Sequence, residues 1–245
     1  IYVTCFIGDE KNGIPKDTDS AEIWQELFAE KGIDNKVVEL GMADNGDKLG
    51  MQGGRIFYYD DQENWWSRGG GIEQTPIGDP CGPDSEVFYD FGEELHDEKE
   101  WGEAHPANDS GRFIEIGNQV FMQYKRTESG FEELPNQNVD FGGGLERIAA
   151  AAINCPDVFK ISILWPIVEK LEQLSGKKYD FSPGDLGYDT MPDCWMEEMK
   201  SMRVIADHLR GAMFLAVDGV KPSNKQQGYV MRRLMRRAIL KAFDL

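Results

Sequence analysis

Residues 138–152, with the sequence NVDFGGGLERIAAAA, limit the possible folds more than any other stretch of the chain. We interpret the first part as the last strand of a sheet and the four alanines as part of a helix. Gly142, Gly143 and Gly144 stand between the two, and because glycine has no Cβ, a ligand or another strand can approach the backbone closely there. The stretch therefore predicts a strand that turns directly into a helix beside a possible binding surface.

Arg147 lies near the start of this predicted helix. The free N–H groups at a helix start suit an anion, whereas a cation there is mildly unfavourable against the helix dipole. A bound phosphate would remove that penalty. The residues alone leave a second interpretation open, in which Arg147 pairs with Glu146 or another neighbour. The dinucleotide fingerprint is not matched, because position 147 would have to be Gly or Ala, and no Walker lysine follows the glycines.

The order of the elements predicts an α+β protein. Segments rich in β-branched and aromatic residues dominate the first 154 residues, and amphipathic helices follow. We expect an antiparallel sheet with flanking helices at 1–154 and a helical part at 155–245. The expected strands are 1–8, 36–41, 54–61, 85–92, 111–126 and 139–143, with a turn at 133–137. The expected helices are 20–33, 144–154, 158–176, 199–219 and 228–243.

The formal net charge of −18 is distributed unevenly. Residues 200–241 contain ten Lys/Arg and two Asp/Glu, a net charge of +8, which leaves −26 on the rest. This asymmetry indicates two parts with different partners. Cys5, Cys81, Cys155 and Cys194 lack metal-ligand spacing and are typical of a reducing cytosol. No apolar run approaches the ~20 residues of a membrane span and no signal peptide is visible, so we expect a cytoplasmic protein without a membrane partner.

Residues 228–243 are predicted to form a basic amphipathic helix. The pairs Arg232–Arg236 and Arg233–Arg237 are like charges at i,i+4, each costing a few tenths of a kcal/mol. An anion should offset them, and the residues leave two candidates open: the acidic remainder of this chain, or the phosphates of an RNA. The opposite, apolar face is expected to comprise Val230, Met231, Leu234, Met235, Ala238 and Ile239.

Four segments, in this order along the chain, resemble class II aminoacyl-tRNA synthetases of the alanyl-tRNA synthetase family. NWWSRGG (64–70) followed by DPCGPDSEVFYDFG (79–92) is similar to the family's Trp-containing loop and its Gly-Pro-Cys-Gly-Pro stretch. RFIEIGNQVFMQYKR (112–126) is similar to the strand that lines the alanine pocket, and residues 138–152 resemble motif 3. Residues 203–239 are similar to the start of the tRNA-recognition region. The resemblance implies ATP-dependent activation of alanine and its transfer to the 3′ end of tRNA(Ala).

The resemblance also implies roles for individual residues. Asp140 would hold the ammonium group of alanine, and we therefore expect a buried carboxylate there that needs a cation. Glu115 occupies the place of a Mg²⁺ carboxylate, and Arg147 would bind the γ-phosphate of ATP. The backbone at Gly142, Gly143 and Gly144 would lie against the nucleotide. The alanine pocket would further contain Trp66, Asn118, Val120 and Gly142. The acceptor stem of tRNA(Ala) would meet Asn224, Arg232, Arg233, Arg236 and Arg237; no DNA partner is expected.

The chain departs from the family pattern at several places. Asp79 and Asp84 replace a Gly and a Cys, and GGIEQTPIG (70–78) is an insertion. Motifs 1 and 2 and the editing domain are not found, so we interpret the chain as an interior piece of the enzyme and expect it to be inactive alone. Two other classes of function stay open: an adenylating amino-acid ligase with a non-tRNA acceptor, and a non-catalytic RNA-binding module.

Overall fold

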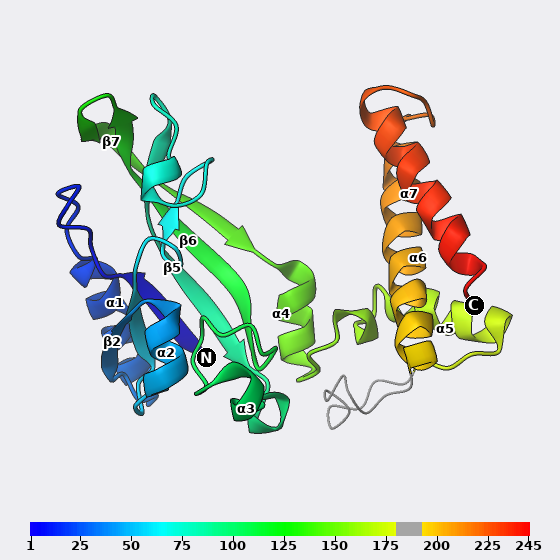
Figure 1. Cartoon of the computed structure of the whole chain (residues 1–245), viewed down its shortest axis with the longest axis horizontal. Coiled ribbons are helices and arrows are strands. Elements are labelled where there is room, and N and C mark those ends of the chain that lie inside the picture. The colour runs from blue at the N-terminus through cyan, green and yellow to red at the C-terminus, as the bar shows by residue number, and fades with distance from the viewer. Residues whose placement is uncertain (180–192) are drawn as a thin grey trace. The chain divides into compact units, whose positions relative to one another are not determined.

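The computed structural model describes residues 1–179 and 193–245 and divides into two compact units, Ile1–Pro156 and Asp157–Leu245 (Figure 1). The first unit contains a seven-stranded sheet with flanking helices, and the second consists of helices. This confirms the α+β class that the sequence predicts. Three of the four cysteines, Cys5, Cys81 and Cys155, form no disulfide bond. Cys194 lies outside the described side chains.

The sheet has the strand order β2–β3–β1–β5–β6–β7, and β4 also pairs with β5. The strands are β1 (Tyr2–Phe6), β2 (Val37–Gly41), β3 (Ile56–Tyr59), β4 (Trp65–Trp66), β5 (Pro80–Asp90), β6 (Phe113–Thr127) and β7 (Gly130–Gly143). The long strands β5, β6 and β7 are antiparallel as predicted, but β1–β3 and β2–β3 are parallel pairs, so the sheet is mixed. The reason is that α1 (Thr18–Glu30) and α2 (Ala43–Leu49) each return the chain across the sheet, a crossover that joins parallel strands.

Strand β7 differs most from its predicted range. Residues 133–137, expected to form a turn, lie inside this strand, and the chain reverses instead between Thr127 and Gly130. The pairing of β6 with β7 shifts here, because Met122 is opposite Asn138 while Tyr124 is opposite Glu133. The extra β7 residues are therefore accommodated by a local irregularity, and the hairpin continues beyond it.

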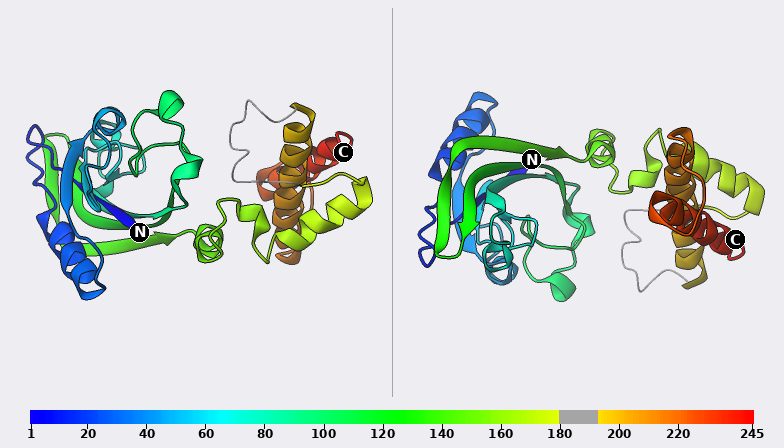
Figure 2. Two further views of the ribbon diagram at one scale, coloured as in Figure 1. Left: turned by 90° about the horizontal axis from the view of Figure 1, so that it is seen from below. Right: turned by 90° about the horizontal axis from the view of Figure 1, so that it is seen from above.

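Alternation along the parallel strands sends apolar side chains to both faces of the sheet. On one face α1 packs on a cluster of Val3, Cys5, Ala21, Phe28, Ile56 and Tyr58. A second cluster contains Val38, Leu40, Phe57 and Tyr59, with Tyr2, Met51 and Ala107 packed against it. Two further views of the ribbon show the sheet with the helices beside it (Figure 2).

The second unit contains α5 (Trp165–Ser175), α6 (Asp193–Val217) and α7 (Gln226–Ala242). Its interior holds a polar group, because the buried Asp157 accepts hydrogen bonds from the Tyr179 hydroxyl at 2.6 Å and from Arg203 Nη2 at 3.3 Å. Around it lie the buried residues Val168, Tyr179, Met199, Met202 and Ala206. None of the described helices is both long enough and apolar enough to span a membrane.

The predicted apolar face of α7 is only partly correct. Met231 and Ala238 are buried, whereas Val230 and Ile239 are 49% and 56% exposed. The two exposed residues lie at the margins of the contact face, about 80–100° from Met231 on a helix of 3.6 residues per turn. The face that packs inward is therefore narrower than the sequence pattern suggests.

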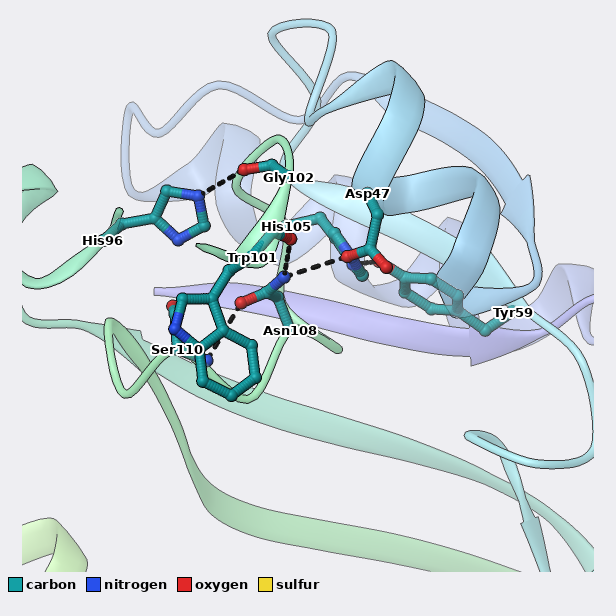
Figure 3. Close-up of polar contacts among 8 residues, drawn as sticks. All are labelled: Asp47, Tyr59, His96, Trp101, Gly102, His105, Asn108 and Ser110. Carbon is teal, nitrogen blue, oxygen red and sulfur yellow. Dashed lines mark hydrogen bonds and ion pairs between the residues drawn. The ribbon is translucent and has the colours of Figure 1, made fainter. Parts of the chain in front are cut away.

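A buried hydrogen-bond network ties α2 and the segment 101–110 to β3 (Figure 3). His105 is fully buried, with Nδ1 2.7 Å from the Tyr59 hydroxyl and Nε2 3.0 Å from Asp47 Oδ1. Because a carboxylate only accepts, Nε2–H donates to Asp47 and Nδ1 accepts from Tyr59, which is the neutral form of the ring. Asn108 Nδ2 donates to the same Asp47 oxygen at 2.9 Å. The ring also fills the space beside Gly46, where a Cβ would lie 2.6 Å from it.

This network gives a testable pH dependence. Burial lowers the pKa of His105, although Asp47 opposes the effect. The unfolded chain therefore binds a proton more readily than the folded protein, and stability should fall as the pH drops below about 6.5. We expect His105→Gln to be less stable than wild type at pH 7.5 by about 1–3 kcal/mol, because buried polar partners lose their hydrogen bonds. The variant should lose less stability than wild type between pH 7.5 and pH 5.

Urea unfolding at the two pH values measures both differences. His96→Gln is the control, because this second histidine bonds only the carbonyl of Gly102 among the described residues. Equal acid sensitivity in wild type and His105→Gln would show that His105 is not the titrating group.

Candidate functional site

The glycine stretch has the predicted form. Strand β7 ends at Gly143, and Gly144 is the N-cap of α4 (Leu145–Ala152). The glycines have different surroundings: no described atom lies within 4 Å of the position of a Cβ on Gly142, whereas a Cβ on Gly143 would lie 2.9 Å from the ring of Phe141. Open space therefore adjoins Gly142, while Gly143 is covered by an aromatic ring.

The register of β6 and β7 brings four of the predicted pocket residues together. Asn118 is opposite Gly142, and Val120 is opposite Asp140. Opposite residues of antiparallel strands point to the same face of the sheet, and every second residue along a strand shares that face. Asn118, Val120, Asp140 and Gly142 therefore form one contiguous block on a single face, which we call the pocket face.

Two adjacent tryptophans take opposite sides of the sheet. Trp66 is opposite Gly82, which shares its face of β5 with Asp84, so Trp66 belongs to the pocket face and is 37% exposed. Trp65 is 5% exposed and stacks on Tyr124 at 6.1 Å in the core. The structure therefore assigns Trp66 to the pocket face and Trp65 to packing.

Asp140 is not buried, contrary to our expectation. The physical reason is its place on β7, the last strand of the sheet, most of whose residues are exposed. The buried carboxylate of the pocket face is instead Asp84, which is 3% exposed and lies opposite Val120, with the half-buried Glu86 opposite Asn118. The desolvation cost that we expected at Asp140 therefore falls on Asp84 and Glu86.

Asp84 and Glu86 are held by amide groups. Asn118 Nδ2 donates to Glu86 Oε1 at 3.0 Å, and the fully buried Asn64 donates to Asp84 Oδ1 at 3.1 Å. Burial raises the pKa of Asp84 to about 7, with Glu115 and Glu63 adding to the effect of burial. Burial also raises the pKa of Glu86 to about 9, reinforced by the neighbouring Asp84, Glu115 and Glu63. The pocket face is thus lined by carboxyl groups that ionise reluctantly.

Sequence reasoning missed Asp84 and Glu86 as members of this face. Their spacing of two residues places both on one side of a strand, which is a usable signal. The spacing alone does not show which face of the sheet Asp84 and Glu86 share. Only the pairing of β5 with β6 shows that they lie on the face that carries Asn118 and Val120.

Arg147 and Glu115 are in contact. Arg147 Nη1 donates to the Glu115 backbone oxygen and to its Oε2, both at 3.0 Å. The side chains are 50% and 35% exposed. The structure therefore brings together the residue predicted to bind the γ-phosphate and the residue predicted to bind Mg²⁺. The same contact also agrees with the second interpretation, in which Arg147 simply pairs with a neighbouring residue.

The predicted RNA-binding residues gather on one side of α7. Arg233, Arg236 and Arg237 are exposed, and the partly exposed Arg232 donates from Nη1 to Asn224 Oδ1. Among the described residues of the helical unit, none of the four arginines forms an ion pair with a carboxylate. The charges of the exposed Arg233, Arg236 and Arg237 therefore face solvent.

Comparison with known proteins defines the class. The family described as tRNA synthetases class II (A) matches residues 1–245, so the chain belongs to the class II tRNA synthetases. Within this class the similar proteins are alanine–tRNA ligases. The chain is 35% identical over 244 residues to that of Borrelia hermsii, covering 98% of this chain and 33% of the relative. The chain is 38% identical over 221 residues to the enzyme of Idiomarina loihiensis, covering 89% of this chain and 21% of the relative. It is 37% identical over 203 residues to that of Deinococcus radiodurans, covering 80% of this chain and 21% of the relative. The chain thus spans a third or less of the length of these relatives.

The raised pKa of Glu86 leads to a prediction about how the folding stability of the protein changes at alkaline pH. Because the folded pKa of Glu86 is raised to about 9, the folded protein binds this proton more tightly than the unfolded chain, and stability should fall as pH rises from about 4.5 towards 9. Glu86→Gln cannot ionise and can still accept from Asn118. We expect it to exceed wild type in stability at pH 8.5 by on the order of 1–2 kcal/mol, with a smaller difference at pH 5.5.

Urea titrations at both pH values test this, with Glu132→Gln on the exposed side of β7 as the control. Parallel loss of stability in wild type and Glu86→Gln would contradict the raised pKa.

Proposed function

We propose that this chain is the part of an alanine–tRNA ligase that binds alanine and ATP and contacts the acceptor stem of tRNA(Ala). The observation that carries the proposal is the pairing of β5, β6 and β7, which gathers Trp66, Asn118, Val120, Asp140 and Gly142 on one face. In the proposed reaction a carboxylate oxygen of alanine attacks the α-phosphorus of ATP and pyrophosphate leaves. The terminal ribose hydroxyl of the tRNA then attacks the carbonyl carbon of the alanyl-adenylate, and AMP leaves.

The proposed pocket suits a small amino acid. Gly142 adjoins open space, and the neighbouring Val120 supplies an apolar surface for a methyl group. Asp140 provides a carboxylate for the ammonium group, and Trp66 forms a wall. The contribution of these residues to catalysis is positioning and charge stabilisation rather than a covalent intermediate.

The nucleotide is proposed to lie across the start of α4. Arg147 and the free N–H groups of this helix suit the phosphates, and the backbone at Gly142, Gly143 and Gly144 can lie against the adenosine. Mg²⁺ would neutralise phosphate charge as pyrophosphate forms. Glu115 suits such an ion, since Mg²⁺ often takes one or two carboxylates and completes its shell with phosphates and water.

Asp140 provides the first test. Asp140→Asn in the full-length protein should lose most alanine activation, roughly 2–4 kcal/mol in transition-state binding, because the ammonium group loses its charged partner. Stability should stay within about 0.5 kcal/mol, since the side chain is exposed. Alanine-dependent ATP–pyrophosphate exchange measures kcat/KM, with Glu133→Gln on the same strand as the control. Unchanged exchange kinetics in Asp140→Asn would remove this residue from the pocket.

The basic face of α7 provides the second test. Arg233→Gln and Arg237→Gln should weaken binding of all tRNAs by a similar factor, because phosphate contacts carry no sequence information. Each should also flatten the dependence of log affinity on log salt by about 0.7–0.9. Filter binding of cognate and non-cognate tRNA from 50 to 300 mM salt measures both. Lys170→Gln, an exposed cation on α5, is the matched control.

The outcomes also separate the remaining classes of function. Full exchange activity without salt-sensitive tRNA binding would favour a ligase with a different acceptor. Salt-sensitive RNA binding without ATP binding would favour a non-catalytic RNA-binding module.

A further inference from the structure

The loop that carries Asn224 is built against the first turn of α7. The Ser223 backbone N–H donates to the Gly228 carbonyl at 2.9 Å, and the Ser223 hydroxyl donates to the Lys225 carbonyl at 3.0 Å. A Cβ on Gly228 would lie 2.2 Å from the Ser223 hydroxyl oxygen and 2.5 Å from the Lys221 carbonyl oxygen. Only a glycine therefore permits this close approach of loop and helix, which fixes the backbone on both sides of Asn224.

The side chain of Asn224 is held from α7 as well. Arg232 lies two turns along the helix, and its Nη1 donates to Asn224 Oδ1. The two ends of an asparagine amide usually cannot be told apart by shape. Here they can, because a guanidinium has five donors and no acceptor, so only the amide oxygen can face it.

This contact determines which group Asn224 presents to solvent. With Oδ1 engaged by Arg232, the two Nδ2–H groups point away from Arg232, and among the described residues of the helical unit they have no hydrogen-bond partner. Asn224 is exposed. The loop thus presents an oriented pair of donors rather than a freely rotating amide.

The residues around Asn224 suit a polyanion that also carries hydrogen-bond acceptors. Residues 221–241 contain seven Lys/Arg and no Asp/Glu. The shallow minor groove of an RNA helix displays base acceptors and 2′-hydroxyls beside its phosphates, so a donor pair within a cationic surface suits it.

We infer that Arg232 is a positioning residue for RNA discrimination: it holds the Asn224 amide with its donors outward, while Arg233, Arg236 and Arg237 meet phosphates. The inference rests on the proposed tRNA binding and separates Arg232 from the other three arginines of α7. Arg232 acts through Asn224, so its loss should alter which RNA is bound more than how strongly all RNAs are bound.

Asn224→Asp is the sharpest variant. An aspartate keeps an oxygen for Arg232 and forms an ion pair with it, so the loop should be at least as stable as in wild type, but both donors are lost. In the full-length protein we expect discrimination between cognate tRNA(Ala) and a non-cognate tRNA to fall about tenfold or more, the size of one lost bidentate-type contact. Thermal unfolding should not change or should shift upward. A purely structural role for Asn224 predicts undiminished discrimination in Asn224→Asp, and this result would overturn the inference.

Arg232→Met tests the positioning role, with Arg233→Met as its matched control. We expect Arg232→Met and Asn224→Ala to lower discrimination between the two tRNAs by a similar factor. The variant that combines both substitutions should lose no more discrimination than either single variant, because the two residues act as one unit. Arg232→Lys retains a donor and should restore part of the discrimination. Arg233→Met should instead lower the affinity for both tRNAs equally and flatten the salt dependence.

Affinities of both tRNAs against salt distinguish the failures. If Arg232→Met behaves like Arg233→Met, Arg232 is a phosphate contact and the inference is wrong while tRNA binding stands. If wild type binds neither tRNA in a salt-sensitive manner, the proposed function fails, and the inference fails with it.

Discussion

The hydrogen-bonded register of β5, β6 and β7 is the constraint on which the site depends. Side chains alternate along a strand, so a slip of one residue would turn Asn118 and Val120 to the opposite face. The residues that carry the site, Asp84–Val87 opposite Gly117–Val120, pair regularly, and the register shifts occur only at the two ends of this block. At one end Gly82 approaches β6 so closely that a Cβ would lie 1.7 Å from the Phe121 carbonyl oxygen. Glycine at this position therefore allows the irregular pairing that leaves the neighbouring block in register.

The pocket face gathers acidic side chains, which suits the ammonium group of the proposed substrates and opposes the phosphates of the nucleotide. Burial, together with the neighbouring Glu115 and Glu63, raises the pKa of Asp84 and of Glu86, and a bound ammonium group would favour the ionised forms of these two carboxyl groups. Where these carboxyl groups ionise, they repel ATP. Arg147 and the start of α4 provide the local positive potential that an anionic nucleotide needs. The proposed function thus separates the two kinds of ligand group along the chain, with the ammonium group beside β7 before Gly142 and the phosphates at the start of α4.

Much of the fold could be predicted from the sequence, because local patterns determine element type. The glycine stretch, the helices of the second unit and the long strand β6 follow from periodicity and turn residues, whereas the extent of β7 did not. Strand order and direction could not be predicted, since β1 and β3 are joined through two helices and their parallel pairing is long-range. The network of Asp47, Tyr59 and His105 was equally invisible, because it joins residues up to 58 positions apart.

For the candidate site, the sequence indicated which residues to consider but not whether each of them is buried or exposed. Asp140 and Asp84 look alike in sequence, yet one is exposed on the last strand and the other is buried two strands away. Adjacent Trp65 and Trp66 likewise differ because strand alternation sends one to the core. Which of two neighbouring residues serves function therefore depends on the sheet as a whole.

The contact between Arg147 and Glu115 shows how a site can be ordered before a ligand binds without resisting it. Exposed ion pairs contribute only about 0–1 kcal/mol, so a phosphate group can displace Glu115 from Arg147 at little cost. The same contact restricts an arginine side chain whose ordering otherwise costs up to about 2 kcal/mol. Part of the side-chain entropy of Arg147 is therefore lost when the protein folds rather than when a ligand binds, which favours ligand binding. In the proposed site, a nucleotide that bound the guanidinium would leave Glu115 with a free carboxylate beside the phosphates, where a divalent cation would offset the repulsion. Glu115 would thereby become available to a cation at the proposed activation step.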